Sequence, residues 1–169
     1  MPLNEKKFIS SLIEKNNFEN NPTVAVGVSG GPDSMALTFM LNSWIKKKKG
    51  KLYALIFDHE FRSNSKEESL HVKNILNEMS IDTKIIKTKN SKIKKKNMAQ
   101  ARKNRFQGLI NFCNKKNILH LFLGHHFDDN IETFLIRKIN GSNLEGLGCM
   151  SEVSHSNKIQ IIRPLINVK

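Results

Sequence analysis

Six consecutive residues between two apolar runs are of the types that bind phosphate: Ser29, Gly30, Gly31, Pro32, Asp33 and Ser34. The apolar run 23–28 before them predicts a strand, and the run 35–41 after them predicts a helix. Glycines let backbone N–H groups approach an anion at a helix N-terminus, and the two serines add hydroxyl donors. Asp33 would repel a bare phosphate, so its presence indicates an intervening Mg²⁺ ion.

A second segment, residues 125–133, combines histidines with carboxylates between a predicted strand and a predicted helix. Asp129 and Glu132 are three residues apart, which places both carboxylates on one helix face. With His126, they suit a divalent cation, a proton acceptor or the ammonium group of an amine substrate. A helix cap explains one aspartate, Asp128 or Asp129, but not the whole cluster. Zinc is the weaker alternative, because no third or fourth nitrogen or sulfur ligand is suitably spaced.

Two arginines, Arg102 and Arg105, lie three residues apart in a helix predicted over 98–116. Both side chains then project from one face of that helix. A guanidinium offers a forked set of donors that fits a phosphate, so the pair is a candidate for neutralising phosphoryl charge. The plainer alternative is a solvated basic face.

The predicted elements alternate between strand and helix, and this alternation positions the candidate residues. The strand 52–59 ends in Asp58 and His59, where a buried parallel strand carries functional groups. Units of this kind predict a Rossmann-like three-layer α/β/α fold with a mainly parallel central sheet. The lysine-rich segment 89–97 is expected to be a loop, with Lys92–Lys96 on a sugar–phosphate backbone. The other predicted strands are 23–28, 82–88, 118–124 and 161–165, and the predicted helices are 3–18, 32–45, 66–80, 98–116 and 128–138.

The composition fits one globular domain with a polyanionic partner. The 169 residues are 38% hydrophobic and carry a formal net charge of +13, which favours contact with nucleic acid. A bias toward Lys, Asn and Ile from AT-rich coding DNA is the competing explanation. The two cysteines, Cys113 and Cys149, form no CxxC motif, which fits a reducing cytoplasm. No apolar run is long enough to span a membrane, so no membrane association is expected.

These segments occur together in the order found in one enzyme family. The Ser-Gly-Gly-x-Asp-Ser turn resembles the loop of N-type ATP pyrophosphatases, which cleave ATP between its α- and β-phosphates. The full set resembles tRNA(Ile)-lysidine synthases over residues 23–166. Glu60 and Asn140 depart from the family pattern, which has glycine and arginine there. Besides the turn, the resemblance rests on Asp58-His59 with Phe61-Arg62 and Ser65, Arg102 with Arg105, His125 to Thr133, Gly141-Ser142 with Gly146-Leu147 and Met150, and Arg163-Pro164-Leu165.

The resemblance implies an adenine nucleotide alpha hydrolase-like fold and an ATP-dependent ligation on RNA. In this family ATP adenylates the wobble cytidine, position 34, of tRNA(Ile) with a CAU anticodon. L-lysine then displaces AMP through its ε-amine and gives lysidine. Family members continue beyond Arg-Pro-Leu into modules that grip the tRNA. Residues 1–169 are therefore expected to be a single catalytic domain without them, whether isolated, truncated or naturally minimal.

The same resemblance assigns roles to the candidate residues. The turn is expected to hold the leaving pyrophosphate, with Mg²⁺ on its aspartate, and the arginine pair neutralises charge on the phosphoryl group. Asp129, backed by His126 or Glu132, is expected to bind or deprotonate the lysine amine. The expected catalytic residues are Asp33, Arg102, Arg105, His126, Asp129 and Glu132, and the expected ATP-binding residues are Ser29, Gly30, Gly31, Pro32, Asp33, Ser34, Asp58 and His59.

Two other functions compete with this one. A tRNA thiolase of the same superfamily adenylates a base oxygen and installs sulfur, but such enzymes carry paired CxxC cysteines, which Cys113 and Cys149 do not supply. A non-catalytic nucleotide- or RNA-binding module would keep the fold without the chemistry. The short chain mildly favours such a module. The four residues that argue against it are Asp33, His126, Asp129 and Glu132.

Overall fold

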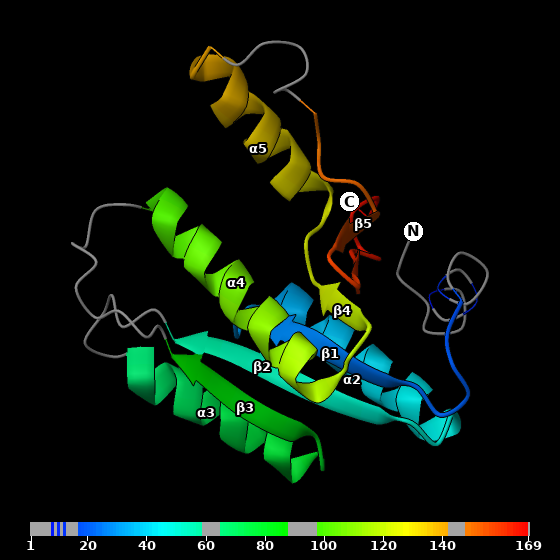
Figure 1. The fold of residues 1–169 in the computed structure, drawn as a ribbon. Coiled ribbons are helices and arrows are strands. Elements are labelled where there is room, and N and C mark those ends of the chain that lie inside the picture. Colours follow the sequence, from blue (N-terminus) through cyan, green and yellow to red (C-terminus); the bar gives the residue numbers. More distant parts are fainter. Residues whose placement is uncertain are drawn as a thin grey trace.

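The computed structural model of the protein shows one six-stranded sheet with helices on both of its faces (Figure 1). The predicted three-layer α/β fold is therefore confirmed. The strands are β1 (Thr23–Val28), β2 (Lys51–Asp58), β3 (Asp82–Lys87), β4 (His120–Leu123), β5 (Val153–Ser156) and β6 (Ile159–Ile162), and the helices are α2 (Pro32–Lys47), α3 (Ser65–Glu78), α4 (Met98–Lys116) and α5 (Phe127–Ile139). The structure describes residues 8, 10, 12, 17–58, 65–87, 98–141 and 148–168.

The sheet has the strand order β3-β2-β1-β4-β6-β5, and only β5 runs antiparallel to its neighbour. From β1 the chain crosses through α2 to β2 on one side, whereas β4 pairs with β1 on the other side. The connections that leave β1 and β4 therefore diverge at the carboxyl edge of the sheet. Such a switch point opens a crevice in which doubly wound folds bind ligands. Both chemically rich segments of the sequence begin at this crevice.

Alternating residues of the central strands supply two separate cores. Val24, Val26 and Val28 of β1 pack with α2 and α3, whereas Ala25 faces α4 on the opposite side of the sheet. Because both faces are covered, the strand sequence reads as a continuous apolar run rather than an alternating one. In Figure 1, α5 projects beyond the sheet, and it has no buried residue. None of the described helices combines the length and apolarity that crossing a membrane requires.

The C-terminal part of the sheet corrects the sequence prediction. The predicted strand 161–165 is β6 over Ile159–Ile162, and a turn follows because Pro164 lacks the N–H that would continue the ladder. Strand β5 has no counterpart in the prediction, since Val153-Ser-His-Ser156 lacks an apolar pattern. It forms because the chain reverses at Asn157, whose φ of 54° suits a tight turn, and pairs back on β6.

Some predictions fall mostly or wholly outside the described residues. In the predicted helix 3–18, Phe8 and Leu12 are helical and buried, which agrees with the expected apolar face. The predicted loop 89–97 and His59 are not among the described residues. Predicted helix and strand ends elsewhere agree with the structure to within three residues.

The buried β6 residue Ile162 and the exposed α5 residue Ile139 form a matched pair for testing the core. Ile162 is 0% exposed and Ile139 is 83% exposed. We expect Ile162→Ala to lower the free energy of unfolding by about 2–5 kcal/mol, because the cavity cannot fully collapse. Ile139→Ala should change it by less than about 0.5 kcal/mol. Urea unfolding followed by the fluorescence of the single tryptophan, Trp44, measures both, and equal losses would contradict the core assignment.

Candidate functional site

The turn after β1 presents an open helix N-terminus. Gly30 adopts φ +85°, a conformation that side chains rarely take, and Pro32 occupies the start of α2. Gly31 is the N-cap residue, and no side chain caps the helix. The backbone N–H groups of the first turn therefore lack the capping partner that helices commonly have. This geometry suits an anion.

The two serines of the turn have different environments. Ser34 is 6% exposed, and its hydroxyl donates to the Gly31 carbonyl oxygen at 2.9 Å and accepts from the Ser29 N–H at 3.2 Å. Ser29 is exposed, with its hydroxyl 3.2 Å from that of Ser34. Ser34 therefore stabilises the turn through hydrogen bonds on its buried side. Ser29 lies on the solvent side, where a ligand would bind.

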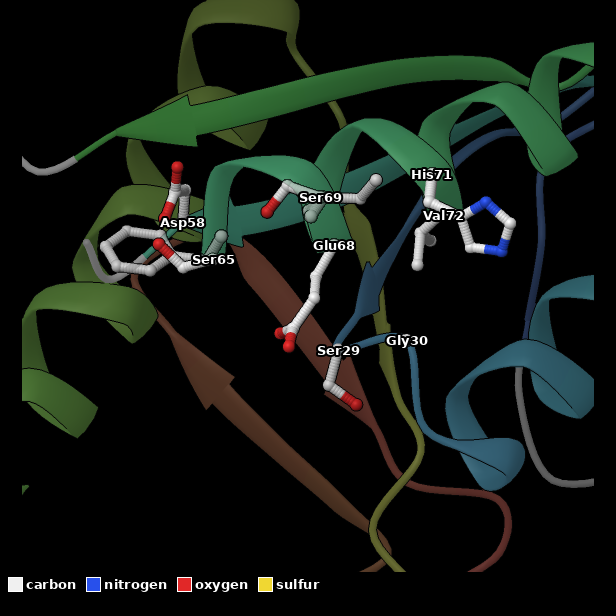
Figure 2. Close-up of a pocket in the computed structure, with 10 residues that line it drawn as sticks. Ser29, Gly30, Asp58, Ser65, Glu68, Ser69, His71 and Val72 are labelled. Carbon is white, nitrogen blue, oxygen red and sulfur yellow. The ribbon is translucent and has the colours of Figure 1, made fainter. Parts of the chain in front are cut away.

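A cleft of about 490 Å³ opens on one side of the turn, between it and α3 (Figure 2). This volume is in the range typical of small-molecule sites. Asp58 lines the cleft from the end of β2 and is 2% exposed. The structure thus brings Ser29, Gly30 and Asp58 of the predicted ATP-binding set to one cleft. The other lining residues are Ile56, Phe57, Ser65, Glu68, Ser69, His71 and Val72.

The start of α5 is closed by its own side chains, and the predicted capping by Asp129 is confirmed, although Asp129 is not the N-cap residue. His126, not an aspartate, is the N-cap residue, and its Nδ1 accepts from the N–H of Asp128 at 3.2 Å. The carboxylate of Asp129 accepts from the N–H of His126 at 2.8 Å. This reciprocal arrangement is a capping box. Asp129 therefore holds its own helix in addition to any role in chemistry.

On the other side of the turn, the two chemically rich segments meet. Nε2 of His126 lies 3.7 Å from Oδ2 of Asp33 and 3.8 Å from Oδ2 of Asp129. The Asp33 side chain is 51% exposed, so it remains accessible to a ligand. Glu132 is exposed and lies one helical turn beyond Asp129 on α5. The imidazole of His126 thus bridges the phosphate turn and the carboxylates of α5.

A close backbone contact holds the two segments in this position. A Cβ atom on Gly124, which follows β4, would lie 3.0 Å from Cα and 3.1 Å from N of Ser34. The neighbours are backbone atoms of the first turn of α2, so they have little freedom to move aside. Glycine is the residue that allows this approach. The sequence analysis did not single out Gly124, although it directly follows an apolar run.

Basic side chains converge on the same region from α4 and from the end of β6. Burial lowers the pKa of Arg105, and the charge of Arg102 lowers it further, whereas Asp129 opposes the shift. Burial, reinforced by the charge of Arg163, lowers the pKa of His125 to about 4, and Asp129 again opposes. Arg105 therefore lies near Asp129 of α5, whereas Arg102 is exposed and acts electrostatically on Arg105 and His125. His125 is neutral at pH 7 in this surrounding of positive charge.

Arg163 and His125 each keep a buried nitrogen without a partner. Among the described residues, Nδ1 of His125 and Nε of Arg163 are buried and make no hydrogen bond. Nη1 of Arg163 donates to the Ser151 carbonyl oxygen and to the Ser154 hydroxyl, each at 3.0 Å. Burial lowers the pKa of Arg163. The sequence analysis named Arg163 only as part of the Arg-Pro-Leu motif. Its burial beside the site depends on tertiary contacts, which the spacing of residues in the sequence does not reveal.

The segment that returns from α5 is also tied to that helix. The side-chain amide of Asn130 accepts from the Met150 N–H at 2.8 Å and donates to the Met150 carbonyl oxygen at 3.2 Å. Arg137 donates to the Gly148 carbonyl oxygen. These contacts place the 148–151 segment next to α5, at the border of the site. Asn130 thus positions the 148–151 segment. The sequence analysis did not single it out, because it lies among the charged residues of the motif.

The described residues fit a metal bound mainly by its nucleotide. They include no group of three or more His, Cys, Asp or Glu side chains arranged around one ion. Asp33 alone offers an exposed carboxylate at the phosphate turn. Mg²⁺ is commonly held by one or two carboxylates, with phosphate oxygens and water as the other ligands. A single aspartate at this point is compatible with such an ion.

The fold and the site define a class of protein. The PP-loop domain family matches residues 3–169, so the chain belongs to this family. Membership of this ATP-binding family implies the use of ATP. The phosphate turn at Ser29–Ser34 lies within the matched range.

Among curated proteins, the chain is similar to tRNA(Ile)-lysidine synthases. It is 38% identical to that of Orientia tsutsugamushi (strain Boryong) over 164 residues, which are 97% of this chain and 37% of the relative. It is 38% identical to that of Wolbachia pipientis wMel over 159 residues, 93% of this chain and 37% of the relative. It is 37% identical to that of Rickettsia bellii (strain OSU 85-389) over 145 residues, which are 86% of this chain and 34% of the relative. The chain thus spans about 37% of the length of the first two relatives.

Solved structures confirm the fold. The U34-tRNA thiolase NcsA from Methanococcus maripaludis, with its [4Fe-4S] cluster, matches with a TM-score of 0.79 at 22% identity. The match covers 98% of this chain and 59% of the thiolase. Candida glabrata FMN adenylyltransferase matches with a TM-score of 0.51 at 13% identity, over 96% of this chain and 50% of that one. At these identities the likeness concerns architecture alone.

The low pKa of His125 predicts a specific pH dependence of stability. In the folded protein the imidazole of His125 becomes protonated only near pH 4, whereas in the unfolded chain it becomes protonated near pH 6.5. Stability contributed by the neutral imidazole is therefore present above pH 6.5 and is lost as the pH falls toward 4. Between pH 7 and pH 5 we expect the wild type to lose roughly 2 kcal/mol more than His125→Gln. Urea titrations at both pH values test this, and equal losses would contradict it.

Proposed function

We propose that this chain is the catalytic PP-loop domain of a tRNA(Ile)-lysidine synthase. The observation that carries the proposal is the meeting of the phosphate turn with the histidine and carboxylates of α5, bridged by His126 between Asp33 and Asp129. The lysidine synthase relatives support the same conclusion. Residues 1–169, with a core at 23–166, act as one catalytic domain, and other modules of the longer enzyme contribute to tRNA binding.

The first step activates the wobble cytidine. The C2 oxygen of cytosine is a poor leaving group, so it attacks the α-phosphorus of ATP, forms an adenylate and releases pyrophosphate. The open N-terminus of α2 holds the phosphates through backbone N–H groups. Mg²⁺ on Asp33 neutralises phosphate charge when bound. The half-buried Arg105, with Arg102 beside it, stabilises charge on the transferring phosphoryl group.

The second step transfers lysine. The ε-amine of free L-lysine, whose reference pKa is near ~10.4, loses a proton and attacks C2, and AMP leaves. Asp129 binds the ammonium group and accepts its proton, and Glu132 and His126 support it from the same helix turn and its cap. The target base lies in an anticodon loop with a CAU sequence, so it enters the crevice without opening a duplex. The enzyme acts in the cytoplasm, where this tRNA and free lysine are present.

A thiolase function is less consistent with the chain. Iron–sulfur clusters are held by several cysteine thiolates. The chain has two cysteines, of which Cys113 is buried, with its pKa raised to about 12 by burial, and Cys149 is exposed. The thiolase NcsA matches the fold alone. The two cysteines of this chain do not suit an iron–sulfur cluster, which favours lysine over sulfur as the second substrate.

Replacing the metal-facing carboxylate should stop the first step. We expect Asp33→Asn to reduce tRNA-dependent release of pyrophosphate from ATP by about 100-fold or more, because phosphate charge is no longer neutralised. Pyrophosphate release measured with tRNA(Ile) and lysine tests this. The matched control is Asp82→Asn, since Asp82 pairs with Lys51 at 3.1 Å, at the amino end of the sheet. Full activity of Asp33→Asn would remove the turn from the mechanism.

Replacing Glu132 should affect lysine more than ATP. Glu132 is exposed, so Glu132→Gln avoids the helix-capping role that complicates Asp129. We expect the KM for lysine to rise about 10-fold, because a hydrogen-bonded charge is lost, while pyrophosphate release without lysine is unchanged. Radiolabelled lysine incorporation into tRNA(Ile) measures the first quantity. Glu78→Gln, at the end of α3, is the control, and an unchanged KM would exclude Glu132 from lysine binding.

A further inference from the structure

Helix α3 packs directly against the phosphate turn. A Cβ atom on Gly30 would lie only 3.0 Å from Cγ2 of Val72, and Gly30 adopts φ +85°. Glycine therefore allows the turn and the helix to approach each other closely. α3 is thus one wall of the cleft described above, and Ser29 and Gly30 of the turn line its edge.

Glu68 lies on the wall of this cleft next to the turn. It precedes Val72 by four residues, so both side chains share one face of α3, one turn apart. In Figure 2 the Glu68 side chain extends from α3 toward Ser29. Glu68 is exposed, which leaves its carboxylate accessible to a ligand in the cleft.

The position of Glu68 matches the ribose of a nucleotide. In ATP one ester bond joins the α-phosphate to the ribose, so phosphates on the turn bring the ribose to the adjoining part of the cleft. A carboxylate only accepts hydrogen bonds, and the 2′- and 3′-hydroxyls of ribose are neighbouring donors. Acidic residues bind ribose hydroxyls in this way in other doubly wound folds. We propose that Glu68 binds the ribose hydroxyls of ATP and makes the site select ribonucleotides over 2′-deoxyribonucleotides.

Asp58, the other carboxylate that lines the cleft, is a poorer candidate. In nucleotide-binding folds the ribose is often bound by an acid at the end of the second strand, which is where Asp58 lies. Asp58 is only 2% exposed, however, and already takes part in an interaction within the protein. Glu68, whose carboxylate on α3 is accessible, is therefore a better candidate for binding the ribose than Asp58, although Asp58 lies at the end of the second strand. The inference rests on the proposed function, because it assumes that ATP binds the turn.

Direct nucleotide binding tests the assignment without relying on turnover. Calorimetric titration of the 169-residue chain with ATP and 2′-dATP, in the presence of Mg²⁺, gives Kd values for the wild type, Glu68→Ala and Glu67→Ala. We expect the wild type to bind ATP about 10-fold more tightly than 2′-dATP, and Glu68→Ala to bind both within about 2-fold. Glu67→Ala should behave as the wild type, because Glu67 is an exposed neighbour on α3 outside the cleft lining.

The possible results separate this inference from the proposed function. If Glu68→Ala weakens both nucleotides equally, or neither, the ribose assignment is wrong, while ATP binding and the proposed function stand. If the wild type binds neither nucleotide, both fail.

Discussion

The site depends on a backbone contact between Gly124, after β4, and Ser34, in the first turn of α2. A side chain on Gly124 would press against the Cα and N atoms of Ser34, so the two connections meet without side chains between them. β1 and β4 are adjacent parallel strands, and their connections diverge at the crevice. The contact therefore sets the distance between the phosphate turn and the start of α5. Without it, the imidazole of His126 would not lie between Asp33 and Asp129.

Two helix N-termini lie at this crevice, and they differ in an instructive way. The N-terminus of α5 is closed by the capping box of His126 and Asp129, so its backbone donors are already used. The N-terminus of α2 has no side-chain cap and begins with a glycine turn, so its donors remain for a ligand. The half-buried Arg105 and the buried Arg163 add positive charge nearby. The region is thus organised to receive anions, with a few carboxylates placed at defined points within it.

Different groups of residues lie on the two sides of the phosphate turn. The cleft toward α3 has a volume suited to a nucleoside, and Ser29 and Gly30 line it. The residues on the other side, next to His126, include carboxylates that suit an amine. The thiolase NcsA shares the fold at a TM-score of 0.79, so the architecture does not choose the second substrate. The proposal that lysine is the second substrate therefore rests on the residues beside His126 and on the sequence motifs, not on the architecture.

The sequence by itself determined the fold class, most helices and strands, and the two segments that carry chemistry. It could do so because strand and helix periodicity, glycine turns and carboxylate spacing are local properties of the chain. Tertiary structure alone decided which segments meet: it buried Arg163 and the Nδ1 atom of His125 beside the site, required glycine at Gly124, and made His126 the cap of α5. It also paired the polar strand β5 with β6 and placed α3 against the turn. These features depend on contacts between residues far apart in the chain, and burial and close backbone approach leave no periodic signal in the sequence.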